Sequence, residues 1–265
     1  MELRNKNVVI TGASQGIGEH LADGFAAAGA TVLVIARSTD KLTIVAERVS
    51  GHAITADLAT AAGVDGLVQR CVDTLGHVDV WVNNAGIETT DAFANTDRTT
   101  IRNLARLNFE APLMLTRDVV EHMLGRGSGH IVQMSSVAAS IPFPGLTAYA
   151  GSKAGLTGFT ESLRLELADT AIQLTVVSPG PVDTDMWDRL DTPDAYQAAA
   201  LKRFRQLQFL PKLSPSKIAD ATVQGVINEK RFVRLPARYG MYHMLNNAPR
   251  RLVEVAMTGV KLPLS

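Results

Sequence analysis

Short apolar runs alternate with longer amphipathic stretches along most of the chain. The runs are rich in Val and Ile, end in turn-forming residues and are continuously apolar rather than alternating apolar and polar. This pattern is typical of strands that are covered on both faces, as in a parallel sheet. The runs occupy residues 7–12, 31–37, 52–58, 79–86, 130–136 and 172–180, with a shorter one at 231–236.

Helical patterns fill the intervals between these runs. They cover residues 16–28, 39–49, 60–75, 98–124, 149–168 and 215–228. Alternation of strand and helix implies right-handed crossovers. The sequence therefore predicts an α/β protein with a Rossmann-type, doubly wound parallel sheet of about seven strands and helices on both faces. The length of 265 residues suits a single domain, which we place at residues 1–236, followed by a C-terminal helical extension at 237–265.

Composition excludes several classes of function. Apolar residues make up 46% of the chain, and 26 Lys and Arg balance 26 Asp and Glu, so net charge gives no reason to expect nucleic acid as a partner. The one cysteine, Cys71, is expected to be a small core residue, and no CxxC or HExxH motif suggests a metal site. With no export signal and no long uncharged apolar run, we expect a cytoplasmic protein.

A glycine-rich turn, "TGASQGIG" at residues 11–18, links the first predicted strand to the first helix. Gly12 would permit the sharp turn, Gly16 would let the backbone approach a phosphate, and Gly18 would let the helix pack close to the strand. The N-terminus of the helix would then face a pyrophosphate. A tight strand–helix turn without a ligand would also need glycine, but the place of this motif after the first predicted strand favours dinucleotide binding.

Tyr149 and Lys153 form a second candidate site. At spacing i, i+4 they lie on the same side of a helix. A nearby ammonium favours the phenolate and would lower the phenol pKa, which is ordinarily about 10. The pair suits general acid–base catalysis at a carbonyl or carbinol oxygen. The alternative is a buried tyrosine beside a lysine whose head reaches solvent.

Taken in order, these motifs resemble the short-chain dehydrogenase/reductase family, in its NADP-preferring branch with TGxxxGxG and YxxxK motifs. The resemblance spans about residues 5–235. The matching segments are "TGASQGIG" at 11–18, "ADL" at 56–58, "NNAG" at 83–86, Asn108, "MSS" at 134–136, "YAGSK" at 149–153 and "SPGPVDT" at 178–184.

The resemblance implies four catalytic residues. Tyr149 would donate a proton to the carbonyl oxygen during reduction, and Ser136 would hydrogen-bond the same oxygen. Lys153 would bind the nicotinamide ribose and lower the pKa of Tyr149, and Asn108 would hold a water linking Lys153 to solvent. The side chain of Ser135 should point elsewhere, because successive strand residues face opposite sides.

The resemblance also implies the residues that bind the cofactor. Asn83 would bridge neighbouring strands, and the backbone of Val182 would hold the nicotinamide carboxamide. Asp57 would sit by the adenine, or cap the helix beginning near Thr60, or do both. The full expected set is Gly12, Ser14, Gln15, Gly16, Ile17, Gly18, Arg37, Ser38, Asp57, Leu58, Asn84, Ala85, Gly86, Tyr149, Lys153, Pro179, Gly180, Val182 and Thr184.

The end of the second predicted strand indicates which cofactor is used. An acidic residue there would bind the ribose 2′-hydroxyl of NAD, but this chain has Ala36 followed by Arg37. A guanidinium suits the 2′-phosphate of NADP, and Ser38 could add a hydroxyl. Gln15 stands where many NADP-using relatives carry a basic residue, so use of NAD is also possible. A solvated arginine is the alternative interpretation.

We expect a carbonyl reductase or alcohol dehydrogenase that transfers a hydride between NADP and an apolar ketone, aldehyde or secondary alcohol. The alternative is an NADP-binding regulator or scaffold without turnover. The expectation of an apolar substrate rests on six apolar side chains that follow Ser136 and Thr184. The alternative is that these side chains only pack a lid. They are Ile141, Phe143, Leu146, Met186, Trp187 and Leu190.

Two interaction surfaces are expected. The small side chains of Ala150, Ala154 and Gly158 permit close helix approach, which suits a homo-oligomer (a dimer or a tetramer) or packing on the chain's own sheet. From Lys230 onward the chain carries seven Lys and Arg and one acid, Glu254. The extension at 237–265 could therefore contact an anionic membrane surface, but we favour packing on the domain or on a partner subunit.

Overall fold

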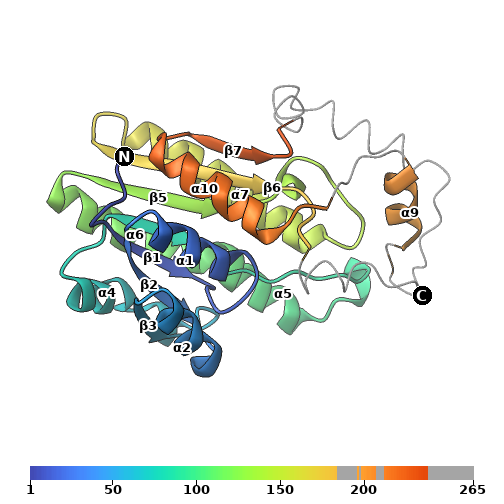
Figure 1. The fold of residues 1–265 in the computed structure, drawn as a ribbon. Helices are drawn as coiled ribbons and strands as arrows, with labels where there is room; N and C mark the ends of the chain where they lie inside the picture. Colours follow the sequence, from blue (N-terminus) through green and yellow to red (C-terminus); the bar gives the residue numbers. More distant parts are fainter. Residues whose placement is uncertain (184–195, 197, 207–211, 238–265) are drawn as a thin grey trace.

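The computed structural model describes residues 1–183, 196, 198–206 and 212–237. A seven-stranded sheet with the order β3-β2-β1-β4-β5-β6-β7 runs through the centre, and all of its pairings are parallel (Figure 1). The predicted fold class is confirmed. The strands are β1 (Asn7–Thr11), β2 (Thr31–Ala36), β3 (His52–Thr55), β4 (Val80–Asn83), β5 (Gly129–Met134), β6 (Ile172–Pro179) and β7 (Phe232–Leu235).

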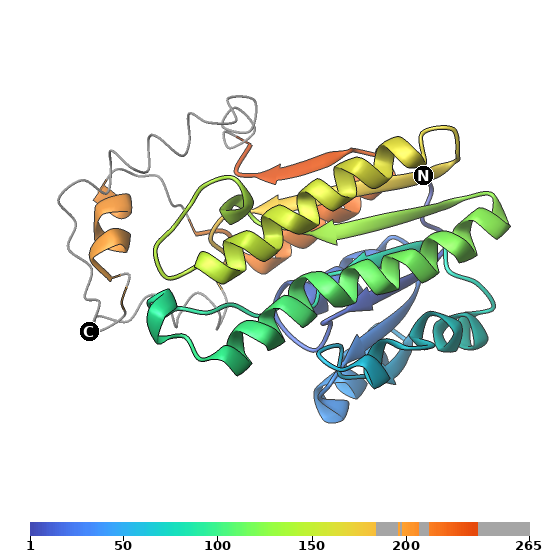
Figure 2. The same ribbon diagram turned by 180° about the vertical axis from the view of Figure 1, so that it is seen from behind.

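Helices cover both faces of the sheet. Helices α1, α2 and α10 lie on the face that Figure 1 shows, and α4, α6 and α7 cover the face that Figure 2 shows. The helices are α1 (Ile17–Ala27), α2 (Thr39–Arg48), α3 (Ala61–Val64), α4 (Leu67–Leu75), α5 (Arg98–Ala105), α6 (Ala111–Arg126), α7 (Thr147–Glu166), α9 (Ala198–Gln206) and α10 (Pro215–Ile227). Three short turns are η1 (Phe93–Asn95), η2 (Arg106–Glu110) and η3 (Val137–Ala139).

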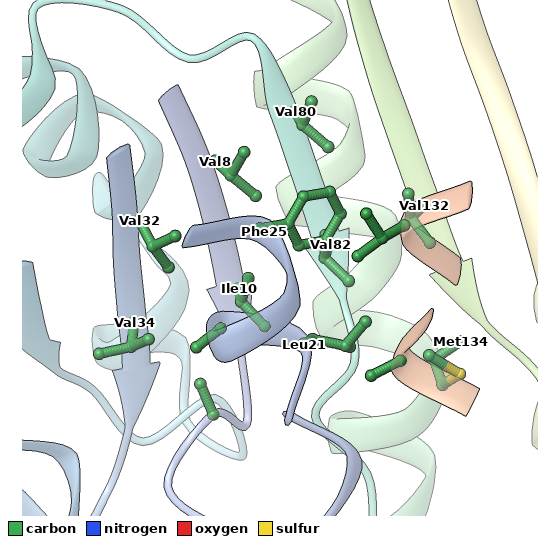
Figure 3. Close-up of a cluster of buried hydrophobic side chains, with 14 of the residues drawn as sticks. Val8, Ile10, Leu21, Phe25, Val32, Val34, Val80, Val82, Val132 and Met134 are labelled. Carbon is green, nitrogen blue, oxygen red and sulfur yellow. The ribbon is translucent and has the colours of Figure 1, made fainter. Parts of the chain in front are cut away.

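The sheet is buried on both faces, which accounts for its continuously apolar strands. Val8 of β1 packs with Leu21 and Phe25 of α1 on one face, as Figure 3 shows, whereas its neighbour Val9 belongs to the cluster on the other face. Val8 and Val9 are both fully buried. Successive strand residues point to opposite faces, so each central strand needs apolar side chains at every position.

Two predicted helices differ in the structure. The helix expected at 60–75 is divided into α3 and α4 at Gly66, whose φ of +69° is incompatible with a continuing right-handed helix. The helix expected at 98–124 contains a π-helical turn, η2, between α5 and α6. Helix α9 was not expected. Residues 238–265 of the predicted extension lie outside the described part of the chain.

The strand order places a crevice near the middle of the sheet. The chain proceeds from β1 to β2 and β3 on one side and then returns to place β4 on the other side of β1. The connections after β1 and after β4 therefore leave the carboxyl edge in opposite directions. A ligand site is expected at such a switch point in an open parallel sheet.

Candidate active site

The glycine-rich turn lies at this switch point, between β1 and α1. Gly12 has a φ of +67°, and a Cβ atom there would lie 2.7 Å from Cα of Ala85. A Cβ at Gly18 would lie 2.2 Å from the carbonyl oxygen of Gly12. Gly16 has a φ of +62° and stands at the N-cap of α1. Glycine is required here because the turn folds against itself and against the loop after β4.

That second loop is tied to the turn through Asn84 and Thr11. The Asn84 side chain donates to the carbonyl oxygens of Thr11 (2.9 Å) and Gly12 (3.1 Å). The Thr11 hydroxyl accepts hydrogen bonds from the backbone N–H groups of Asn84 (3.0 Å) and Ala85 (3.1 Å). Thr11 was not among the predicted site residues, although it opens the glycine motif.

The structure corrects two details of the predicted cofactor site. Asn83 does not bridge neighbouring strands: its side chain donates to Thr116 of α6 and accepts from Trp81 of its own strand. Asp57 does not cap α3, because Thr60 accepts the capping bond from Gly63. The Asp57 carboxylate instead accepts from the Ala59 backbone at 3.0 Å.

The carboxyl end of β2 carries the predicted Arg37 and Ser38, both exposed. Lys41, in the first turn of α2, donates a long hydrogen bond of 3.4 Å to the side-chain oxygen of Gln15. Lys41 thereby links the glycine-rich turn to the start of α2. Lys41 was not among the predicted site residues, although its place four residues after Arg37 was a usable signal. Two cations, Arg37 and Lys41, therefore flank this edge of the crevice.

On the other side of the crevice, Lys153 is almost completely buried. Its Nζ donates to the Met134 carbonyl oxygen at 2.7 Å and lies 5.7 Å from the ring centroid of Tyr149. A Cβ placed on Gly86 would lie 3.4 Å from that Nζ and 3.2 Å from Oδ1 of Asn108. The fold thus brings the predicted Tyr149, Lys153, Asn108 and Gly86 into one cluster.

Asn108 lies in the π-helical turn η2 and is fully buried. Its Oδ1 accepts from the Ile87 backbone N–H at 2.8 Å, and its Nδ2 donates to the Ile87 carbonyl oxygen at 2.7 Å. The side-chain amide of Asn108 therefore holds both backbone polar groups of Ile87, which lies in the loop after β4. π turns are frequent at functional sites, and this one directs Asn108 into the cluster.

The adjacent serines face different partners, as predicted. The Ser136 hydroxyl caps η3 by accepting from the Ala138 N–H at 3.1 Å, and it also hydrogen-bonds the Tyr149 side chain. The Ser135 hydroxyl is buried and bonds the Lys153 carbonyl oxygen (3.2 Å) and the Thr157 hydroxyl (2.7 Å). Ser136 thus faces the phenol, while Ser135 bonds the middle of α7.

Burial controls the protonation of the cluster. The pKa of Tyr149 is raised to about 12: burial and the negative charge of Glu88 raise it, and the hydrogen bond with Ser136 lowers it. Burial also lowers the pKa of Lys153 to about 8. The expectation that the phenol pKa lies below its ordinary value is wrong as a net result, because burial has the largest effect on that pKa and raises it. At neutral pH the phenol keeps its proton.

The remaining predicted residues lie around this cluster or outside the described chain. Pro179 ends β6, the Gly180 N–H donates to the Leu235 carbonyl oxygen, and Val182 pairs with Leu213. Thr184, Met186, Trp187 and Leu190 lie outside the described residues.

An apolar wall adjoins the phenol. Leu146 and Leu201 are buried against each other and contact Phe143 and Tyr149. Leu201 belongs to α9 and was not predicted. Ile141 is partly buried in the same segment, but the apolar cluster does not include it. An apolar group on a substrate therefore has a surface to contact beside the phenol.

Comparison with known proteins decides the family. The family model described as short chain dehydrogenase matches residues 6–195. The chain belongs to the short-chain dehydrogenase/reductase family. It is therefore an oxidoreductase that uses a nicotinamide cofactor and acts on CH–OH or keto groups.

Relatives within the short-chain dehydrogenase/reductase family cover most of the chain. The ketoacyl reductase HetN of Nostoc sp. is 35% identical over 237 residues, which are 86% of this chain and 77% of HetN. A short-chain dehydrogenase structure from Streptomyces avermitilis superposes with a TM-score of 0.79 at 28% identity, covering 96% of this chain and 95% of its own.

A short chain dehydrogenase from Burkholderia cenocepacia J2315, solved in complex with NADP, gives a TM-score of 0.75 at 28% identity. It covers 88% of this chain and 97% of its own. Within the described residues, the present chain shows no helix that is long and apolar enough to cross a membrane.

Proposed function

We propose that this short-chain dehydrogenase/reductase is an NADP-dependent carbonyl reductase and alcohol dehydrogenase acting on apolar ketones, aldehydes or secondary alcohols. The observation that carries this proposal is the partly buried Tyr149, whose side chain is bonded to Ser136 and lies next to Lys153. The alternative, a binding protein without turnover, is not favoured, because the acid and both of its neighbours are in place.

The cofactor would lie across the switch point. The glycine-rich turn fits this role, since Gly16 at the start of α1 places no side chain between a phosphate and the helix N-terminus, where the Gly16 N–H donates to Glu19 Oε1 at 3.0 Å. When bound, the nicotinamide supplies or accepts the hydride. The residues proposed to hold the cofactor are Gly12, Ser14, Gln15, Gly16, Ile17, Gly18, Arg37, Ser38, Asp57, Leu58, Asn84, Ala85, Gly86, Tyr149, Lys153, Pro179, Gly180, Val182 and Thr184.

The cluster would move one proton. In reduction, Tyr149 donates its phenolic proton to the carbonyl oxygen, and Ser136 hydrogen-bonds that oxygen as negative charge develops on it. Lys153 stabilises the resulting phenolate and resupplies the proton. Asn108 fixes the loop after β4 beside Lys153 through its two bonds to Ile87. In alcohol oxidation the phenolate removes the proton instead.

The preference for NADP is proposed on electrostatic grounds. Arg37 follows β2, and Lys41 lies one helical turn further along. Two cations at this edge suit a 2′-phosphate, and no acidic side chain ends β2 to accept the ribose hydroxyl of NAD. The solved Burkholderia relative binds NADP, which agrees with this choice.

Incubation with NADPH and a panel of carbonyl compounds tests the proposed reaction. We expect loss of absorbance at the reduced nicotinamide band with alkyl or aryl ketones and aldehydes. If none of the panel consumes NADPH while the protein still binds it, the binding-protein alternative is favoured instead.

The two directions should differ in how strongly their rates depend on pH. The pKa of Tyr149 is raised to about 12, so the proton required for reduction is present throughout the neutral range. Ketone reduction should vary little with Tyr149 ionisation between pH 6 and 8. Alcohol oxidation needs the phenolate and should rise up to about tenfold per pH unit over the same range. Initial rates at constant ionic strength check this, and oxidation that falls with pH would contradict it.

We further propose a homo-oligomer that uses the outer face of α6 and α7. Leu165 of α7 is 79% exposed, and Met114 and Leu124 of α6 are about half exposed. Gly158 of α7 is exposed and has nothing near its Cα in the direction of a side chain, so another helix could approach closely. Light scattering at micromolar concentration tests this, and a monomer mass would contradict it.

A further inference from the structure

The backbone of Gly16 is held by two side chains from the start of α1. The Gly16 N–H donates to Oε1 of Glu19 at 3.0 Å. The Gly16 carbonyl oxygen lies 2.8 Å from Nδ1 of His20, and because a carbonyl oxygen only accepts, the His20 ring donates this bond. Two consecutive residues of one helix therefore bind both polar groups of the glycine that stands at the N-cap of α1.

The conformation of Gly16 needs such support. Its φ of +62° and ψ of −134° lie in a region that glycine adopts far more readily than other residues. Glycine also loses more conformational freedom than any other residue when its backbone is fixed. The bonds from Glu19 and His20 come from the chain itself, so they limit that freedom before a cofactor binds.

The second oxygen of the Glu19 carboxylate faces a cation. Oε2 of Glu19 lies 3.6 Å from the guanidinium of Arg48, in the last turn of α2. Arg48 is in turn oriented by Asp23, which lies one turn further along α1 and accepts two hydrogen bonds of 2.8 and 3.1 Å. The positive charge of Arg48 offsets that of the Glu19 carboxylate, which reduces the repulsion between this carboxylate and a nearby diphosphate.

We propose that Glu19 and His20 are positioning residues for the cofactor, which hold Gly16 in the conformation that presents the start of α1 to the diphosphate. The N–H groups of Ile17 and Gly18 begin the helix and have no acceptor within it, so they would bind the phosphate oxygens. A turn that is already ordered loses less entropy on binding, and the affinity is higher for that reason. This inference rests on the cofactor site of the proposed function.

Titration of NADPH and NADH into variants of the full chain, followed by nicotinamide fluorescence, tests the inference. Glu19→Ala removes the acceptor of the Gly16 N–H and should raise the dissociation constant about fivefold, which is within the net contribution of one hydrogen bond. His20→Ala should have an effect of similar size. Both cofactors should weaken by the same factor because they share the diphosphate, whereas loss of Arg37 should weaken NADPH more than NADH.

Conservative variants and a matched control separate positioning from a general loss of stability. Glu19→Gln keeps an oxygen that can accept the same bond, and His20→Asn keeps an N–H donor attached to Cγ, as Nδ1 is. Both should bind the cofactors no more than about twofold more weakly than the wild type, because the bond to Gly16 is retained. Glu47→Ala removes an exposed carboxylate from α2 and should leave both dissociation constants unchanged.

Hydrogen exchange measured by mass spectrometry follows the turn itself. Without cofactor, the amides of residues 11–19 should exchange faster in Glu19→Ala than in the wild type, and saturating NADPH should slow their exchange in the wild type. If NADPH leaves this segment unprotected, the cofactor lies elsewhere, and the proposed cofactor site fails together with the inference.

If NADPH protects the segment but Glu19→Ala binds it as tightly as the wild type does, the cofactor site stands and the positioning role is refuted. Tighter binding by Glu19→Ala would also refute it, since the carboxylate would then compete with the diphosphate. These measurements use no carbonyl compound, so a failure of the proposed reaction leaves their outcome unaffected.

Discussion

Tyr149→Phe should lower the turnover number for ketone reduction at least about 100-fold, which is the usual contribution of a general acid. The substitution removes the hydroxyl and leaves the ring that packs against Leu146 and Leu201. Affinity for NADPH should therefore change little. Stopped-flow turnover and fluorescence titration of NADPH measure the two quantities on the same preparation.

Tyr196→Phe makes the same chemical change at a partly buried residue outside the cluster and is the control. It should keep turnover within a few-fold of the wild type. A Tyr149→Phe enzyme that reduces ketones at the normal rate would show that another group supplies the proton. The assignments of Ser136 and Lys153 would then fail as well, since both act through the phenol.

Replacing Ala36 by Asp together with Arg37→Ala should reverse the cofactor preference. The wild type is expected to bind NADPH at least about tenfold more tightly than NADH, because a guanidinium–phosphate bond contributes about 1.5 to 3 kcal/mol. The new carboxylate would accept the ribose hydroxyl of NADH and repel the 2′-phosphate of NADPH. The ratio of the two dissociation constants should therefore change by about 100-fold or more.

Titration of both cofactors against the wild type, the double variant and Lys41→Ala measures this effect. Lys41→Ala should weaken NADPH binding alone and less than loss of Arg37 does, because Lys41 already bonds Gln15. Tighter binding of NADH than of NADPH by the wild type would refute the proposed role of Arg37.

Features set by local sequence were predictable. The apolar runs gave the parallel sheet, and the glycine spacing located the turn at the switch point. The i, i+4 spacing placed Tyr149 and Lys153 on one face of α7. Each of these depends on residues close together in the chain, where backbone geometry leaves few alternatives.

Features that depend on distant contacts were not predictable from such patterns. The Asn108 amide meets Ile87 across 21 positions, and Leu201 reaches Leu146 from a helix that no periodicity indicated. The sign of the pKa shift at Tyr149 was also missed. The i, i+4 spacing predicts that Lys153 lies near Tyr149, but the degree of desolvation of the phenol depends on every element packed around it.

The π-helical turn η2 separates two requirements that a regular helix would couple. Successive residues of an α-helix are rotated by about 100°, so the face that α6 buries would dictate where Asn108 points. The wider π-helical turn changes the direction of Asn108 relative to the side chains of α6. Ala111 and Leu115 therefore face the sheet while Asn108 reaches Ile87. Deleting one residue from Arg106–Glu110 would restore a regular helix and rotate α5 relative to α6. Because of this change of direction, α6 can bury Ala111 and Leu115 while Asn108 keeps its bonds to Ile87.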